Sequence, residues 1–146
     1  MINVPDLPVQ LELASRQAEN IPDQVREIVM PCGSGLSAVG VLVGIARFAK
    51  PVDRVWLITT GYPRIAFVRS KLRAALAQRY APAAHPKRVS EILLAREVPF
   101  RYERPEPFAY GDINFHPLYE AKAFRWALEN LNLKPKRTLL WIVGSA

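Results

Sequence analysis

The sequence predicts an α/β fold in which a mostly parallel β-sheet is covered by helices on both faces, giving three layers. Three observations support this fold class. First, three short apolar segments have the length of strands: 26–30, 54–59 and 138–143. Second, segments with helical spacing of apolar residues lie between them. Third, the strand segments lack the alternation of apolar and polar residues that half-exposed strands show. The 146 residues are about one domain's worth, so we expect a single domain over 1–146.

The first half of the chain gives the elements around the first strand. Residues 10–20 predict a short helix that ends before Pro22, and 26–30 predict a strand. Residues 37–48 predict a helix rich in Gly, Ala and Val. Because Gly40 and Gly44 weaken a helix, this composition favours close packing on the sheet over intrinsic helix strength.

The middle of the chain continues the pattern. Residues 54–59 predict a strand that is buried on both faces, and 65–80 have the apolar spacing of a helix. Residues 81–87 contain two prolines and predict a loop, and 90–96 predict a short helix.

The last third predicts one more helix and strand. Prolines frame 99–107, which allows at most an edge strand there. Residues 116–131 predict an amphipathic helix, and 138–143 predict a third buried strand that ends at Gly144.

A glycine turn joins the first strand to the following helix. Gly33, Ser34 and Gly35 come directly after an apolar strand, and the backbone amides at a helix start attract an anion. We therefore predict a phosphate-binding loop at 32–37. The turn does not match the P-loop, the dinucleotide fingerprint or the nucleophile elbow, so a purely structural turn is the alternative.

Other polar residues are expected near this turn. In parallel sheets, ligands bind outside the carboxyl ends of the strands. Gly144, Thr59, Thr60 and Gly61 follow or end the other predicted strands, so we expect them at the same edge as the turn.

The positive charge of the chain is concentrated in one stretch. The net charge is +7, and residues 64–104 hold ten Lys or Arg against three Glu. Such a stretch attracts nucleic acid or phosphorylated ligands, although a solvated helix face is the simpler interpretation.

Composition also limits the compartment and the chemistry. The single cysteine, Cys32, and the lack of a signal peptide indicate a cytoplasmic protein, and we interpret this thiol as a buried one. Residues 29–46 are apolar, but Pro31 and the glycine turn contradict a membrane span. Two histidines and one cysteine give no recognised metal-ligand spacing, so we expect no metal site.

Two motifs carry a family resemblance. The segment His116-Pro117-Leu118-Tyr119-Glu120-Ala121-Lys122-Ala123-Phe124, followed by Thr138-Leu139-Leu140-Trp141-Ile142-Val143-Gly144, resembles the C-terminal end of fold type II pyridoxal-phosphate enzymes. The similar branch is that of 1-aminocyclopropane-1-carboxylate deaminase and D-cysteine desulfhydrase. The turn Gly33-Ser34-Gly35-Leu36-Ser37 resembles the phosphate loop of that family.

The resemblance implies a cofactor site and a function. Pyridoxal 5'-phosphate would be held by Gly33, Ser34, Gly35, Leu36 and Ser37, with Asp112 near the pyridine nitrogen and Gly144 in the terminal motif. The fold would be part of the family's large domain. The activity would be that of a lyase or deaminase acting on an amino acid or amine.

The chain departs from the family pattern in three ways. Leu36 replaces a loop glycine, and Val143 replaces a hydroxyl residue. The region with the lysine that forms a Schiff base with the cofactor has no match, so the catalytic residues are unassigned. A second chain would have to supply that lysine, or the protein would act as a homo-oligomer.

Three interpretations follow. The chain is the C-terminal half of a pyridoxal-phosphate enzyme, incomplete by itself; or a non-catalytic accessory domain that binds phosphate or nucleic acid through 64–104; or an unrelated α/β domain whose turn is structural.

Overall fold

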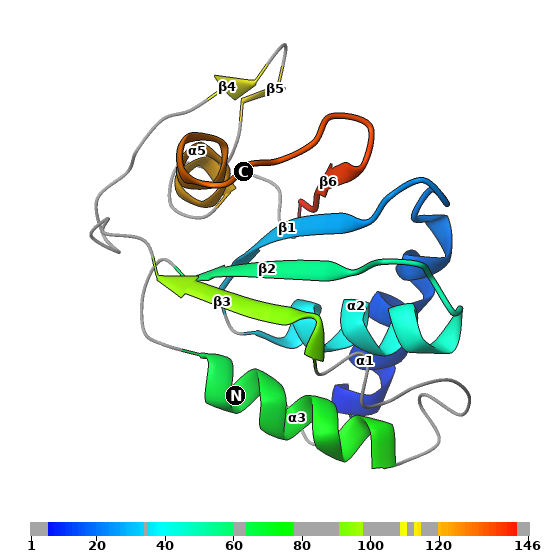
Figure 1. Ribbon diagram of the computed structural model, residues 1–146. Helices are drawn as coiled ribbons and strands as arrows, with labels where there is room; N and C mark the ends of the chain where they lie inside the picture. Colours follow the sequence, from blue (N-terminus) through cyan, green and yellow to red (C-terminus); the bar gives the residue numbers. More distant parts are fainter. Residues whose placement is uncertain are drawn as a thin grey trace.

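Four parallel strands form the main sheet of the computed structural model, which describes residues 6–33, 35–59, 64–77, 91–97, 109–110, 113–114 and 120–142. Their order across the sheet is β3-β2-β1-β6 (Figure 1). The predicted parallel α/β sheet is confirmed. The strands are β1 (Glu27–Cys32), β2 (Arg54–Thr59), β3 (Leu93–Glu97) and β6 (Thr138–Leu140).

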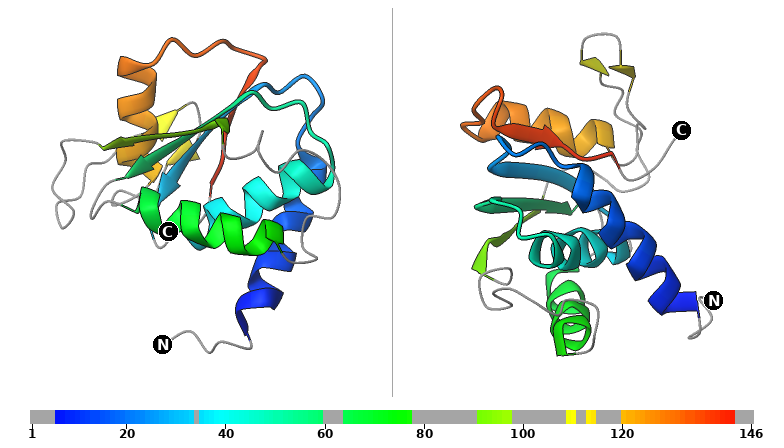
Figure 2. Two further views of the ribbon diagram at one scale, coloured as in Figure 1. Left: turned by 60° about the horizontal axis from the view of Figure 1, so that its bottom comes forward. Right: turned by 90° about the vertical axis from the view of Figure 1, so that its right-hand side faces the viewer.

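Helices cover both faces of this sheet, which confirms the predicted three layers (Figure 2). On one face lie α1, α2 and α3, whose apolar side chains share one core with inward residues of the strands. On the opposite face lies α5, which packs on Val29, Trp56 and Ile58. The helices are α1 (Asp6–Gln17) with the 3-10 turn η1 (Ala18–Asn20), α2 (Leu36–Arg47), α3 (Ile65–Ala77) and α5 (Glu120–Asn130).

The two central strands pair along their full length. The register runs from Glu27 opposite Arg54 to Cys32 opposite Thr59. Every residue of β1 and β2 after the first is buried, as expected for strands that are covered on both faces. The predicted second strand has the observed bounds, whereas β1 continues two residues further than predicted, through Pro31 to Cys32.

The predicted helix at 90–96 is wrong, because most of this segment is the strand β3. Leu, Ala, Arg and Glu favour a helix locally. In the fold, the segment pairs in parallel with β2, from Val55 opposite Leu93 to Thr59 opposite Glu97. Tertiary pairing at the sheet edge therefore outweighs local propensity, and the sheet has four strands where three were expected.

The C-terminal strand is shorter and more exposed than predicted. β6 spans three residues, all of them half-buried, and it pairs with β1 from Glu27 opposite Thr138 to Val29 opposite Leu140. A small antiparallel pair, β4 (Ala109–Tyr110) and β5 (Ile113–Asn114), was not predicted. The edge strand considered at 99–107 lies outside the described residues.

The helix α2 packs on the sheet as expected, whereas its two glycines face another helix. A Cβ atom at Gly40 would lie 2.3 Å from Cβ of Ala14, and one at Gly44 would lie 2.3 Å from the carbonyl oxygen of Ser15. Gly40 and Gly44 therefore let α1 and α2 approach closely. Arg47 at the end of α2 also donates a hydrogen bond of 2.8 Å to Oε1 of Glu12 in α1.

The direction of the strand order changes at β1. From β1 the chain passes through α2 to β2 on one side, whereas β6 is added on the other side of β1 after α5 on the opposite face. In open α/β sheets, ligands bind at the carboxyl ends of strands where the order reverses in this way. The turn after β1 therefore occupies the position where a ligand is expected.

None of the helices that the structure describes combines the length and the apolar character that a membrane crossing needs.

Candidate functional site

The turn between β1 and α2 requires glycine at Gly35. This residue precedes the helix with φ of 91° and ψ of −10°, a left-handed conformation that L side chains rarely adopt. A Cβ atom there would also lie 2.8 Å from Cγ2 of Val68 in α3. The close approach of α3 and the left-handed backbone together explain the glycine, whereas Gly33 before it is exposed.

The start of α2 presents backbone amides and no competing negative charge. The amide of Val39 donates to the carbonyl oxygen of Gly35 at 3.1 Å, so the amides of Ser37 and Ala38 lie before the first hydrogen bond of the helical i to i−4 kind. The first turn contains no acidic residue. The positive end of the helix dipole therefore lies directly after the turn, as an anion site needs.

The two other loop residues that the structure describes differ in exposure. Ser37 is exposed, so its hydroxyl is accessible to a ligand. Leu36 is half-buried and is the first residue of α2, with an ordinary negative φ. A glycine is therefore not needed at Leu36 for the backbone to make this turn.

Cys32 lies beside the turn but is a poor nucleophile. Its residue is 4 % exposed, and burial raises the pKa of the thiol to about 11, although the positive charge of Arg64 acts in the opposite direction. At neutral pH the thiol keeps its proton. The prediction of a buried rather than an activated cysteine is confirmed.

Arg64 is a candidate site residue that the sequence analysis treated only as part of a basic stretch. It is exposed, lies directly before α3, and is near enough to Cys32 to affect its pKa. A residue between a parallel strand and the next helix lies at the carboxyl edge of the sheet, and this position was the signal available in the sequence. Thr59, as predicted, ends β2 at this edge, and it is buried.

The start of α5 buries two charged residues. Glu120 is 1 % exposed and Lys122 is fully buried, and both make interactions within the fold. Since α5 follows the opposite face of the sheet, these residues are not on the side of α2. The amphipathic pattern predicted at 116–131 did not indicate burial of these charges.

Several predicted site residues lie outside the described residues. They are Ser34, Asp112 and Gly144, and also Thr60 and Gly61, which were expected at the same edge of the sheet. Within the described ranges, the structure brings Gly33, Gly35, Leu36 and Ser37 together at the start of α2. The same ranges contain no group of three His, Cys, Asp or Glu residues that could hold a metal ion.

The chain is similar to a phage enzyme. It is 28 % identical over 181 residues to the O-seryl-dTMP PLP-dependent decarboxylase of Salmonella phage ViI, a match that covers 91 % of this chain and 43 % of the phage protein. No family model matches the chain. The chain thus spans less than half the length of this relative. The expected similarity to pyridoxal-phosphate-dependent enzymes is confirmed by this relative, whereas the fold type II branch and the C-terminal position stay predictions.

Proposed function

We propose that this chain is the pyridoxal-phosphate-binding part of an enzyme that acts on an amino acid or amine. The observation that carries the proposal is the left-handed Gly35, which places the open start of α2 directly after the strand at which the sheet order reverses. The similarity to a pyridoxal-phosphate-dependent decarboxylase over 91 % of the chain supports the choice of cofactor.

The residues of the turn fit a phosphate group. In this proposal, the amides of Gly35, Ser37 and Ala38 donate to the phosphate oxygens, and the exposed hydroxyl of Ser37 donates one further hydrogen bond. No acidic side chain in the first turn repels the anion. Arg64 adds positive charge at the same edge of the sheet.

The reaction class follows from the relative. When bound, pyridoxal phosphate withdraws electrons from the α-carbon of an amino acid and so permits loss of a carboxylate or of another group. The phage enzyme is named for a seryl group linked to dTMP. We infer decarboxylation of an amino acid that is joined to a nucleotide, within the lyase class and on the fold type II scaffold that the motifs predict.

No lysine that the structure describes at the turn is suited to bond the cofactor. Nζ of Lys50 donates to the carbonyl oxygen of Ile21 at 2.9 Å, at the opposite end of α2. Nζ of Lys71 lies 5.8 Å from the centre of the Phe67 ring, and Lys122 is a fully buried residue of α5 on the other face of the sheet. In this proposal the lysine comes from polypeptide outside the matched segment, in a second chain or another part of the enzyme.

A second function has support from α3. This helix carries three cations and no acidic residue, and Arg69 and Arg73 are exposed one turn apart. Like charges at this spacing repel each other, so a bound polyanion would stabilise them. The alternative proposal is therefore an accessory domain that binds nucleic acid through 64–104. Salt-dependent retention on DNA without any cofactor binding would favour it.

A titration with matched ligands tests the main proposal. Purified protein is titrated with pyridoxal phosphate, with pyridoxal and with inorganic phosphate, and its melting temperature is followed. We expect pyridoxal phosphate to raise the melting temperature and phosphate to compete with it, because the turn binds the phosphate group. Equal effects of pyridoxal and pyridoxal phosphate, or no effect of either, would contradict the proposal.

A further inference from the structure

The two outer strands of the main sheet differ in how they are protected. β3 carries the exposed Arg96, and a charge of this kind at a sheet edge discourages pairing with another chain. β6 and the two residues after it, Trp141 and Ile142, carry no charge. Ile142 is 51 % exposed. Of the two outer strands of the described sheet, β6 is therefore the one without charged side chains.

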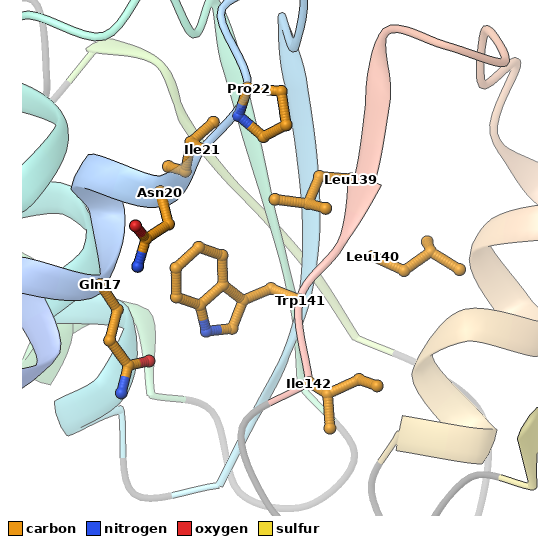
Figure 3. Close-up of a pocket in the computed structure, with 8 residues that line it drawn as sticks. All are labelled: Gln17, Asn20, Ile21, Pro22, Leu139, Leu140, Trp141 and Ile142. Carbon is orange, nitrogen blue, oxygen red and sulfur yellow. The ribbon is translucent and has the colours of Figure 1, made fainter.

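A groove of about 540 Å³ lies beside this edge (Figure 3). One wall comes from the end of α1 and from η1, with Gln17, Asn20 and Ile21, and the other from β6 and its continuation, with Leu139, Trp141 and Ile142. The indole of Trp141 points from the strand toward Gln17 and Asn20. Apolar side chains thus form much of a surface that is open to a partner.

An apolar stripe on α1 extends this groove. Val9 is 58 % exposed and Leu13 is 57 % exposed. With Gln17 they are spaced four residues apart, so the three side chains lie on one face of the helix and Gln17 lines the groove. Three of the four large apolar residues that are exposed in the described ranges, Val9, Leu13 and Ile142, belong to this continuous region, which we name the edge surface.

We propose that the edge surface binds the polypeptide that corresponds to the part of the phage relative outside the match. The identity of this partner rests on the proposed function. The relative is more than twice as long as its matched segment, so in the relative the segment similar to this chain is joined to further polypeptide. A strand added to β6 would satisfy the edge backbone groups, and its apolar side chains would cover Trp141 and Ile142.

Coexpression with the proposed partner, followed by a measurement of complex formation, tests this proposal. The chain is coexpressed with a tagged polypeptide made of the part of the phage decarboxylase outside the match, and complex formation is measured by analytical ultracentrifugation. We expect a one-to-one complex with the unaltered chain. The double variant Leu13→Glu/Ile142→Glu should bind at least about tenfold more weakly, because it places charge in an apolar interface. Both substituted residues are exposed, so the free variant should keep its melting temperature.

Leu128→Glu is the matched control, because Leu128 is an exposed leucine on α5, outside the edge surface. This variant should bind like the unaltered chain. The absence of any complex, or equal binding by the double variant, would overturn the proposal. Self-association of the free chain that the double variant removes would also overturn it, since a second copy would then occupy the surface. No cofactor enters this assay, so a failed cofactor titration with an intact complex would reject only the proposed function.

Discussion

The start and the middle of α2 use glycine for different purposes. At the start, Gly35 adopts a positive φ and leaves the first helical amides facing an accessible turn with an exposed Ser37. In the middle, Gly40 and Gly44 are buried and bring α1 into contact. Within ten positions, glycine thus serves two purposes: it gives the candidate site its backbone conformation, and it allows two helices to pack closely.

This difference separates ligand binding from stability along a single helix. Changes in the middle of α2 should alter the free energy of unfolding and leave ligand affinity of the folded protein unchanged. Changes at the exposed start should alter ligand affinity and leave the free energy of unfolding unchanged. A change at Gly35, which contacts α3, should alter both quantities. The following substitutions test that separation.

Gly44→Val should have the largest effect on stability. A side chain there meets the backbone oxygen of Ser15 at 2.3 Å, and backbone cannot easily move aside. We expect a loss of about 3 kcal/mol in the free energy of unfolding from overpacking. Urea denaturation measures it, with Ala74→Val on the exposed side of α3 as the control, which should cost about 0.5 kcal/mol. Equal losses in both variants would contradict close packing of α1 on α2.

Gly35→Ala should weaken both stability and cofactor binding. The left-handed backbone costs an L residue about 1–2 kcal/mol, and the new methyl group also meets Val68. We expect the affinity for pyridoxal phosphate to fall by about tenfold or more, equal to about 1.4 kcal/mol. Calorimetric titration below the melting temperature measures this. An unchanged affinity would show that the turn does not hold the phosphate.

Cys32 predicts a loss of stability at alkaline pH. The folded thiol has a pKa of about 11 against the usual 9.0, because of burial. Between these values the unfolded thiol loses its proton first, so the folded state binds more protons and stability falls as pH rises. The full loss from pH 9 to pH 11 is about 2–3 kcal/mol. Chemical denaturation at a series of pH values should show this fall in the free energy of unfolding. Cys32→Ala should remove the part of the fall that the thiol causes. The same fall in Cys32→Ala as in the unaltered protein would mean that the thiol is not buried.

Ser37→Ala should have the smallest effect and only on binding. The residue is exposed, so the free energy of unfolding should change by less than about 0.5 kcal/mol. Loss of one hydroxyl hydrogen bond, about 1 kcal/mol, should lower the cofactor affinity about fivefold. Calorimetric titration with pyridoxal phosphate measures this loss of affinity and compares it with the loss in Gly35→Ala. A larger loss for Ser37→Ala than for Gly35→Ala would shift the main contact from the backbone to the side chain.

Most of the fold follows from local patterns in the sequence. The bounds of β2 were predicted correctly because its apolar residues are buried on both faces, and because Gly61 and Pro63 follow it in the sequence. The strand β3 was not predicted, because its Leu, Ala, Arg and Glu residues favour a helix until they pair with β2. The half-buried state of β6 depends on which strand forms the sheet edge, and a strand's own sequence does not contain that information.

The parts of the candidate site that depend only on residues adjacent in the sequence were predicted. The turn at Gly33 and Gly35 and the following helix are local features, and the structure places them together. The nearness of Arg64 to Cys32 and the contact of Gly35 with Val68 depend on the packing of α3, so the sequence did not indicate them. The same holds for the burial of Lys122, which an amphipathic pattern assigns to solvent.

Amide chemical shifts of the isotope-labelled protein during titration with pyridoxal phosphate test the central claim most directly. This measurement locates the ligand as well as detecting it. If the start of α2 holds the phosphate, the amides of Gly35 to Ala38 should show the largest changes, and inorganic phosphate should perturb the same amides. Largest changes along Arg69 and Arg73 of α3, with the α2 amides unaffected, would contradict the account.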